Sequence, residues 1–71
     1  MALRSGVAGR VVEFDDPRGL GVIETEDGER FGFHCTAIAD GTRTLAVDTA
    51  VRFDVVAGHL GRWEAVGITS A

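Results

Sequence analysis

The stretch Arg18-Gly19-Leu20-Gly21-Val22-Ile23, followed after a short turn by Phe31-Gly32-Phe33-His34-Cys35, decides the fold of this chain. Both segments are short and largely apolar, and the turn between them contains Asp27-Gly28, a dipeptide typical of tight hairpins. They therefore predict two paired strands over residues 20–24 and 30–34. The central glycine of each strand indicates sharp coiling, a bulge or a close approach by another group.

Turn signals recur at short intervals along the rest of the chain, and they predict three further strands. The first covers residues 10–14, and the last two cover residues 51–56 and 62–69. A short helical turn is expected near residues 36–38. In residues 51–56 apolar side chains alternate with polar ones, as in a strand with one buried face.

Five short strands, with a long connection before the last two, predict an all-β fold and favour a small five-stranded antiparallel barrel. Closure of the barrel removes the exposed edges that such strands would otherwise present. Residues 1–8 are expected to form a loose lead-in, and residues 9–71 form the one domain. The residues expected inside are apolar: Val11, Ile23, Phe31, Phe33, Ile38, Val51, Phe53 and Ile68.

Composition sets limits on function. The 71 residues carry a formal net charge of −4, and all seven basic residues are arginines, which can both bind phosphate and stack on a base. A single cysteine excludes an intrachain disulfide, and no segment resembles a signal peptide or a membrane span. We therefore expect a cytoplasmic protein. The net negative charge does not exclude a nucleic-acid partner, because a local basic surface can lie on an acidic domain.

The order and spacing of several short motifs resemble those of the cold-shock domain family, whose fold is the small oligonucleotide-binding (OB) barrel. The motifs are Gly9-Arg10-Val11, Phe14-Asp15, Arg18 to Ile23, Phe33-His34, Thr36-Ala37-Ile38, Gly41 to Leu45, Val51-Arg52-Phe53 and Gly58 to Gly61. Two departures occur: the loop between Ile38 and Leu45 is one residue short, and the last strand is one residue long. The resemblance covers nearly the whole chain.

The resemblance implies binding of single-stranded RNA or DNA, with bases stacked on exposed rings and basic side chains along the phosphates. Most of the family's ring positions hold other residues in this chain, and His34 is the stacking group that remains. Those positions are Glu13 at the family's tryptophan, Leu20 and Val22 at its motif phenylalanines, Gly32, Cys35 and Thr42. The candidate nucleic-acid-binding residues are Arg10, Arg18, Leu20, Val22, His34, Arg43 and Trp63.

The missing rings predict weak binding. Stacking of a base on a ring contributes about 1–3 kcal/mol, so the loss of five or six rings removes on the order of 5–10 kcal/mol of gross binding energy. Glu13 would in addition repel phosphate. Trp63 is a candidate for a displaced stacking platform, with capping of the barrel end as the alternative.

A second class of function remains open. The apolar residues Val12, Leu20 and Val22 would suit a protein partner or a second copy of the chain, if nucleic-acid binding has been lost. No cofactor, metal site or catalytic set is expected, because one Cys beside one His does not make a zinc site. The sequence leaves open the choice between RNA and DNA and any base preference.

Overall fold

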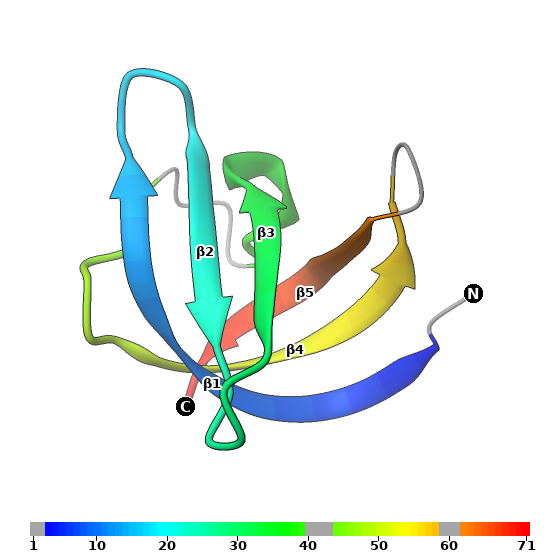
Figure 1. The fold of residues 1–71 in the computed structure, drawn as a ribbon. Helices are drawn as coiled ribbons and strands as arrows, with labels where there is room; N and C mark the ends of the chain where they lie inside the picture. The colour runs from blue at the N-terminus through cyan, green and yellow to red at the C-terminus, as the bar shows by residue number, and fades with distance from the viewer. Residues whose placement is uncertain (1–2, 40–43, 59–61) are drawn as a thin grey trace.

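The computed structural model describes residues 3–39, 44–58 and 62–71. These residues contain strands and one short 3-10 turn, with no α-helix among them (Figure 1). The elements are β1 (Arg4–Asp15), β2 (Leu20–Glu24), β3 (Arg30–His34), the turn η1 (Cys35–Ala37), β4 (Ala50–Ala57) and β5 (Trp63–Ser70). No helix in this described part is long and apolar enough to cross a membrane.

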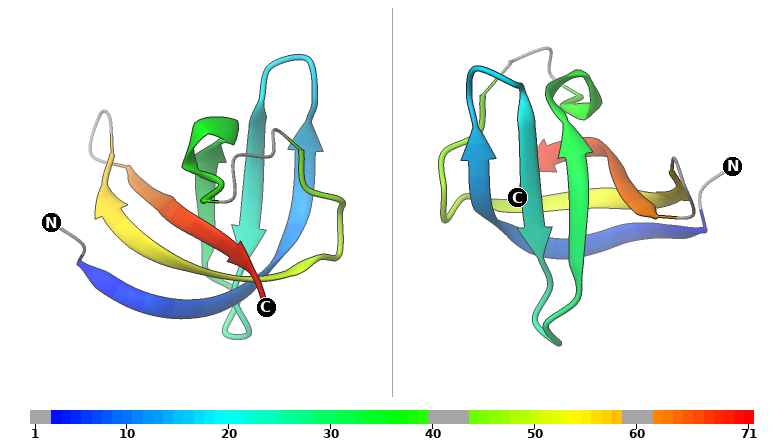
Figure 2. Two further views of the ribbon diagram at one scale, coloured as in Figure 1. Left: turned by 180° about the vertical axis from the view of Figure 1, so that it is seen from behind. Right: turned by 45° about the horizontal axis from the view of Figure 1, so that its top comes forward.

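The five strands close into a barrel in the order β1-β2-β3-β5-β4, which confirms the predicted fold class. Every pairing is antiparallel except the closing one, where a single parallel contact joins Gly32 to Glu64. Strand β1 is long and strongly curved, so its first half pairs with β4 and its second half with β2 (Figures 1 and 2). β2 and β3 have the predicted bounds, and η1, β4 and β5 differ from theirs by one residue at one or both ends.

Strand β1 begins earlier than the sequence predicted. Residues 4–8 were expected to be loose, yet they belong to β1 and pair with β4. Gly6 has a φ of 61° at an irregularity in this pairing, and its N–H donates to the Asp54 carboxylate over 3.1 Å. The segment is mostly exposed, so it lacks the apolar alternation by which a strand is recognised in a sequence.

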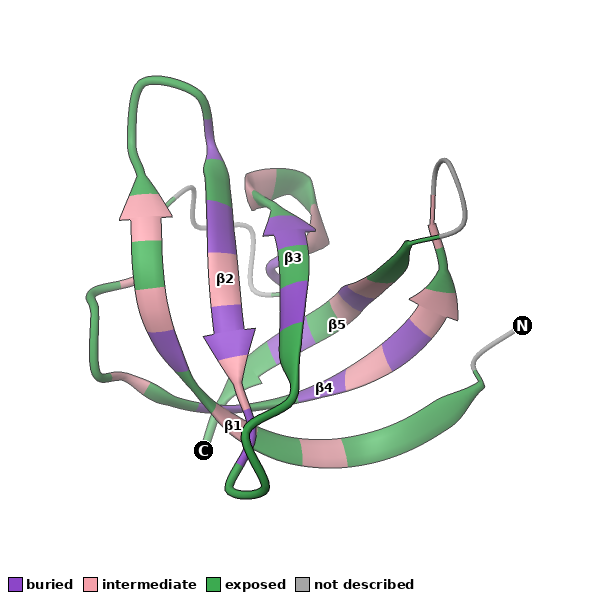
Figure 3. Cartoon of the chain, viewed as in Figure 1, coloured by how far each residue is buried: buried purple, intermediate pink, exposed green. Residues whose placement is uncertain are grey.

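All eight apolar residues expected inside the barrel are buried, and Val55 and Ala65 join them in the core (Figure 3). Aromatic rings fill much of this interior. The Phe31 and Phe53 rings meet at a centroid distance of 5.6 Å, and the half-buried Phe14 stacks on Phe33 at 6.0 Å. Burial of such side chains contributes about 1.5–3 kcal/mol each, so this cluster stabilises the barrel.

A bulge in β1 sets the direction of its side chains. Val11 pairs with Ile23 and Glu13 pairs with Val22, so Val12 is an extra residue between two successive pairs. Without the bulge, Val11 and Glu13 would lie on the same face of the strand. With it, Val11 is fully buried and Glu13 is exposed.

Candidate nucleic-acid interface

The outer face of β1, β2 and β3 is ordered in two rows by the strand register. One row runs from Glu13 through Val22 to Gly32, and the next from Asp15 through Leu20 to His34. Glu13, Leu20 and Gly32 are all exposed, as predicted from the resemblance. Four of the positions to which the resemblance assigns rings, Glu13, Leu20, Val22 and Gly32, therefore lie side by side on one surface. Thr42 lies outside the described residues.

A groove of about 410 Å³, which we call the β2–β5 groove, crosses this surface. Its sides are formed by Leu20, Gly32, His34, Arg62, Trp63 and Glu64, above the buried Gly21 and Phe33. Leu20 is 46 % exposed and Trp63 is 54 % exposed. Three of the residues selected from the sequence, Leu20, His34 and Trp63, thus line the same groove. They come together because β5 meets β3 when the barrel closes.

Two glycines shape this groove in opposite ways. A Cβ atom on Gly21 would collide with the Phe33 ring, so the absence of a side chain there lets the ring pack into the core. A Cβ atom on Gly32 would meet nothing closer than the Gly21 carbonyl oxygen at 3.9 Å. Gly32 therefore leaves open space between His34 on β3 and Trp63 on β5.

The His34 ring is held by the turn that follows it. The backbone N–H of Thr36 donates to His34 Nδ1 over 3.3 Å, and the Thr36 hydroxyl lies 3.0 Å from the same nitrogen. Because Nδ1 accepts, the hydrogen of the neutral ring is on Nε2. His34 therefore presents an N–H donor, which suits a base carbonyl or a phosphate oxygen.

Val22 lies apart from Trp63, in a second groove of about 460 Å³ that we call the β1–β2 groove. The residues that line it are Val12, Glu13, Phe14, Asp15, Leu20, Gly21, Val22 and Val47. Leu20 and Gly21 line both grooves, and the exposed Leu20 side chain forms the ridge between them. Sequence reasoning missed Val47, which is 52 % exposed and follows no strand pattern that would single it out. Sequence reasoning also missed Glu64, because this residue reaches the β2–β5 groove only through the contact of β5 with β3.

The basic candidates lie outside both grooves or outside the described residues. Arg10 pairs with Asp48 at 3.8 Å, and Arg18 pairs with Asp15 at 3.6 Å. Both pairs are well exposed, so each holds its arginine weakly. Arg43 lies outside the described residues.

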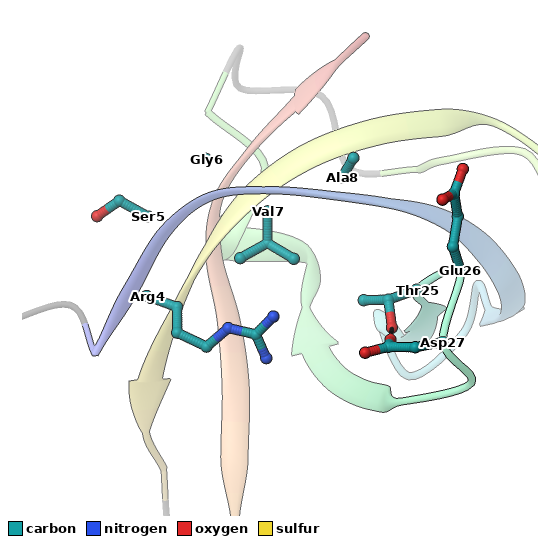
Figure 4. A pocket seen from close by; sticks show the side chains of 8 residues that line it. All are labelled: Arg4, Ser5, Gly6, Val7, Ala8, Thr25, Glu26 and Asp27. Atoms are coloured by element: carbon teal, nitrogen blue, oxygen red, sulfur yellow. Dashed lines mark hydrogen bonds between the residues drawn. The ribbon is translucent and has the colours of Figure 1, made fainter.

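A third hollow, between the start of β1 and the β2–β3 turn, is lined by both polar and apolar residues (Figure 4). Arg4 lines it, yet its guanidinium is engaged by Glu29 at 2.9 Å and lies over the Phe31 ring. A hydrogen bond from the Thr25 hydroxyl lowers the pKa of Asp27 below its usual range. The Arg4–Glu29 pair links β1 to the turn, and the Thr25–Asp27 hydrogen bond stabilises the turn itself.

Cys35 is half-buried and packs against the core, with its sulfur 3.9 Å from His34 Nδ1. In the described residues, no group of three or more His, Cys, Asp or Glu side chains is arranged to hold a metal ion. The thiol therefore acts as a filler between the turn at Gly19 and the barrel.

A small closed five-stranded barrel with an exposed ring, a histidine and an arginine along an outer groove is typical of the class of oligonucleotide-binding barrels. Comparison with known proteins places the chain within that class. Residues 7–71 match the family model described as the "'Cold-shock' DNA-binding domain". The chain belongs to the cold-shock domain family, as the sequence motifs indicated. This family binds single-stranded nucleic acids and is not a family of enzymes.

Curated relatives agree with this assignment. The chain is 43 % identical over 54 residues to cold shock-like protein CspC of Bacillus cereus, a match covering 75 % of this chain and 83 % of the relative. It is 39 % identical over 54 residues to cold shock protein CspD of Bacillus subtilis, covering 75 % and 82 %. It is also 40 % identical over 73 residues to glycine-rich protein 2 of Nicotiana sylvestris, covering 97 % of this chain and 34 % of that protein.

Proposed function

We propose that this cold-shock domain binds single-stranded RNA or DNA weakly, with one base held in the β2–β5 groove against Trp63 and His34. The observation that carries the proposal is the meeting of Leu20, His34 and Trp63 in one groove, although they come from three different strands. In this proposal the domain binds nucleic acid without a cofactor. A cytoplasmic location remains our prediction.

The chemistry of the groove supports a base as its occupant. Trp63 offers an exposed flat ring from one side, and Leu20 offers an apolar edge from the other. The Nε2–H of His34 can donate to a base carbonyl or to phosphate. Arg62 is exposed beside Trp63, where a guanidinium can contact the phosphate next to the stacked base. One stacking ring in place of several is the reason to expect micromolar or poorer affinity.

Replacement of Trp63 by Ala is expected to weaken binding of a pyrimidine-rich oligonucleotide by about tenfold, because stacking on one ring contributes about 1–3 kcal/mol. Binding is measured by the anisotropy of a labelled strand, as DNA and as RNA. Leu3→Ala is the matched control, since Leu3 is 52 % exposed and lines neither groove. If both variants bind like the wild type, Trp63 is not the platform.

The salt dependence of binding should show how many phosphates are contacted. Each phosphate contact on a single strand contributes about 0.7 to the slope of log K against log salt concentration. With Arg10, Arg18 and Arg43 engaged, the slope should be about −2. Titrations at two or more salt concentrations measure it. Tight binding that does not change with salt would contradict the proposal, because it would require stacking that the chain does not supply.

The second candidate function is a protein-interaction or dimerisation module. The observation in its favour is the exposure of two apolar side chains, Leu20 and Val47, along the β1–β2 groove. Sedimentation of the isolated domain over a range of concentrations separates the two functions. A monomer that binds oligonucleotides supports the first, and a dimer that does not bind them supports the second.

A further inference from the structure

The β1–β2 groove contains a carboxylate that has no partner among the described residues. Two acidic residues line this groove, and one of them, Asp15, pairs with Arg18. The side chain of the other, Glu13, makes no hydrogen bond or ion pair within residues 3–39, 44–58 and 62–71. It projects from the bulge in β1, beside Val12 and opposite Val22.

The surroundings of Glu13 suit a flat, partly apolar ligand. Val12 and Val22 are half-buried, and Val47 and Leu20 stand exposed at the borders. Since Leu20 separates this groove from the β2–β5 groove, a strand with one base beside Trp63 can place a neighbouring base beside Glu13. The acceptor-only carboxylate then faces the edge of that base rather than its phosphate.

We propose that Glu13 makes the β1–β2 groove selective for bases that carry an amino group. A carboxylate accepts from the N4 amino group of cytosine, and in the same way it can accept from the amino groups of adenine and guanine. Uracil and thymine present a carbonyl oxygen where cytosine presents that amino group, and their one edge donor, N3–H, lies between two carbonyl oxygens that repel the carboxylate. The inference rests on the proposed function, because it assumes that a strand crosses this face.

The proposal is tested with oligo(dC) and oligo(dT) of equal length, and with the corresponding C and U strands of RNA. We expect the wild-type chain to bind the cytosine strands about tenfold more tightly than the thymine or uracil strands. The variant Glu13→Gln keeps the size of the side chain, and its amide can accept and donate. Its cytosine-to-thymine affinity ratio should therefore fall to about one, while its affinity for oligo(dT) rises.

Glu26→Gln is the matched control, because it removes one negative charge from an exposed position in the β2–β3 turn that lines neither groove. It should change the affinity for all strands equally and leave the ratio unchanged. Thermal melts of both variants check that the barrel is intact.

Equal binding of cytosine and thymine strands by the wild type overturns the inference and leaves the proposed function standing. A ratio that survives Glu13→Gln also overturns it, since the preference would then come from another residue. Absence of binding to every strand overturns the proposed function itself.

Discussion

The combined variant Glu13→Trp, Leu20→Phe and Gly32→Phe is expected to bind pyrimidine-rich single strands at least a hundredfold more tightly than the wild-type chain. That gain corresponds to about 2.8 kcal/mol. Each added ring can return about 1–3 kcal/mol of base stacking. Three rings therefore supply about 2.8 kcal/mol even when each contributes only the lower value. The substitution at position 13 also lowers the net negative charge of the face, which favours a polyanionic strand at long range.

The structure offers room for all three rings. Each of these residues is exposed on the outer face, and none contributes to the buried core. At Gly32 the space beside the backbone is open, so a side chain there enters the β2–β5 groove without disturbing Phe33. A tryptophan-fluorescence titration measures affinity, and a thermal melt shows that the fold is retained.

A control variant places the same rings on exposed strand positions outside both grooves: Ser5→Trp, Ala8→Phe and Thr69→Phe, with Glu26→Gln to match the charge. It should gain little affinity. If the first variant folds normally and gains no more than this control, the outer face of β1–β3 is not the binding face. The interaction-module function would then be the better explanation.

The direction of Glu13 shows the limit of pattern reasoning. Strict alternation along β1 would place Glu13 on the inner face with Val11, and the resemblance to the cold-shock family was needed to predict that it points outward. The physical cause is the bulge at Val12, which shifts the strand by one residue. A bulge depends on the pairing with β2, so the sequence of β1 alone does not specify it.

The cores of β3 and β4 could be predicted, because their apolar residues at every second position report burial directly. Strand β2, whose apolar residues face both ways, was predicted from the turn at Asp27-Gly28 and its pairing with β3. The meeting of Trp63 with His34 could not be predicted from spacing. It depends on the closing contact between β3 and β5, which are separated in sequence and share a single bridge pair, Gly32 with Glu64. Val47 could not be predicted, because it lies in the loop before β4, where the direction of side chains follows no regular period.

The two mid-strand glycines are expected to respond in opposite ways to replacement by Ala. Neither has a positive φ, so both backbones accept an L side chain, and the outcome depends on packing alone. Gly21 and Gly32 occupy neighbouring strands, one facing the core and one facing solvent.

Gly21→Ala should destabilise the barrel by about 2–3 kcal/mol, since the new methyl group overlaps the Phe33 ring and sits 3.0 Å from the Glu13 carbonyl oxygen. In a domain of this size, 1 kcal/mol changes the melting temperature by about 4–8 °C, so the loss should exceed about 8 °C. Gly32→Ala is the matched control and should raise stability by about 0.5–1 kcal/mol. Thermal melts of both variants at one pH decide the matter. A Gly21→Ala variant as stable as the wild type would mean that Phe33 can leave its place, and that the floor of the β2–β5 groove is not fixed by the core.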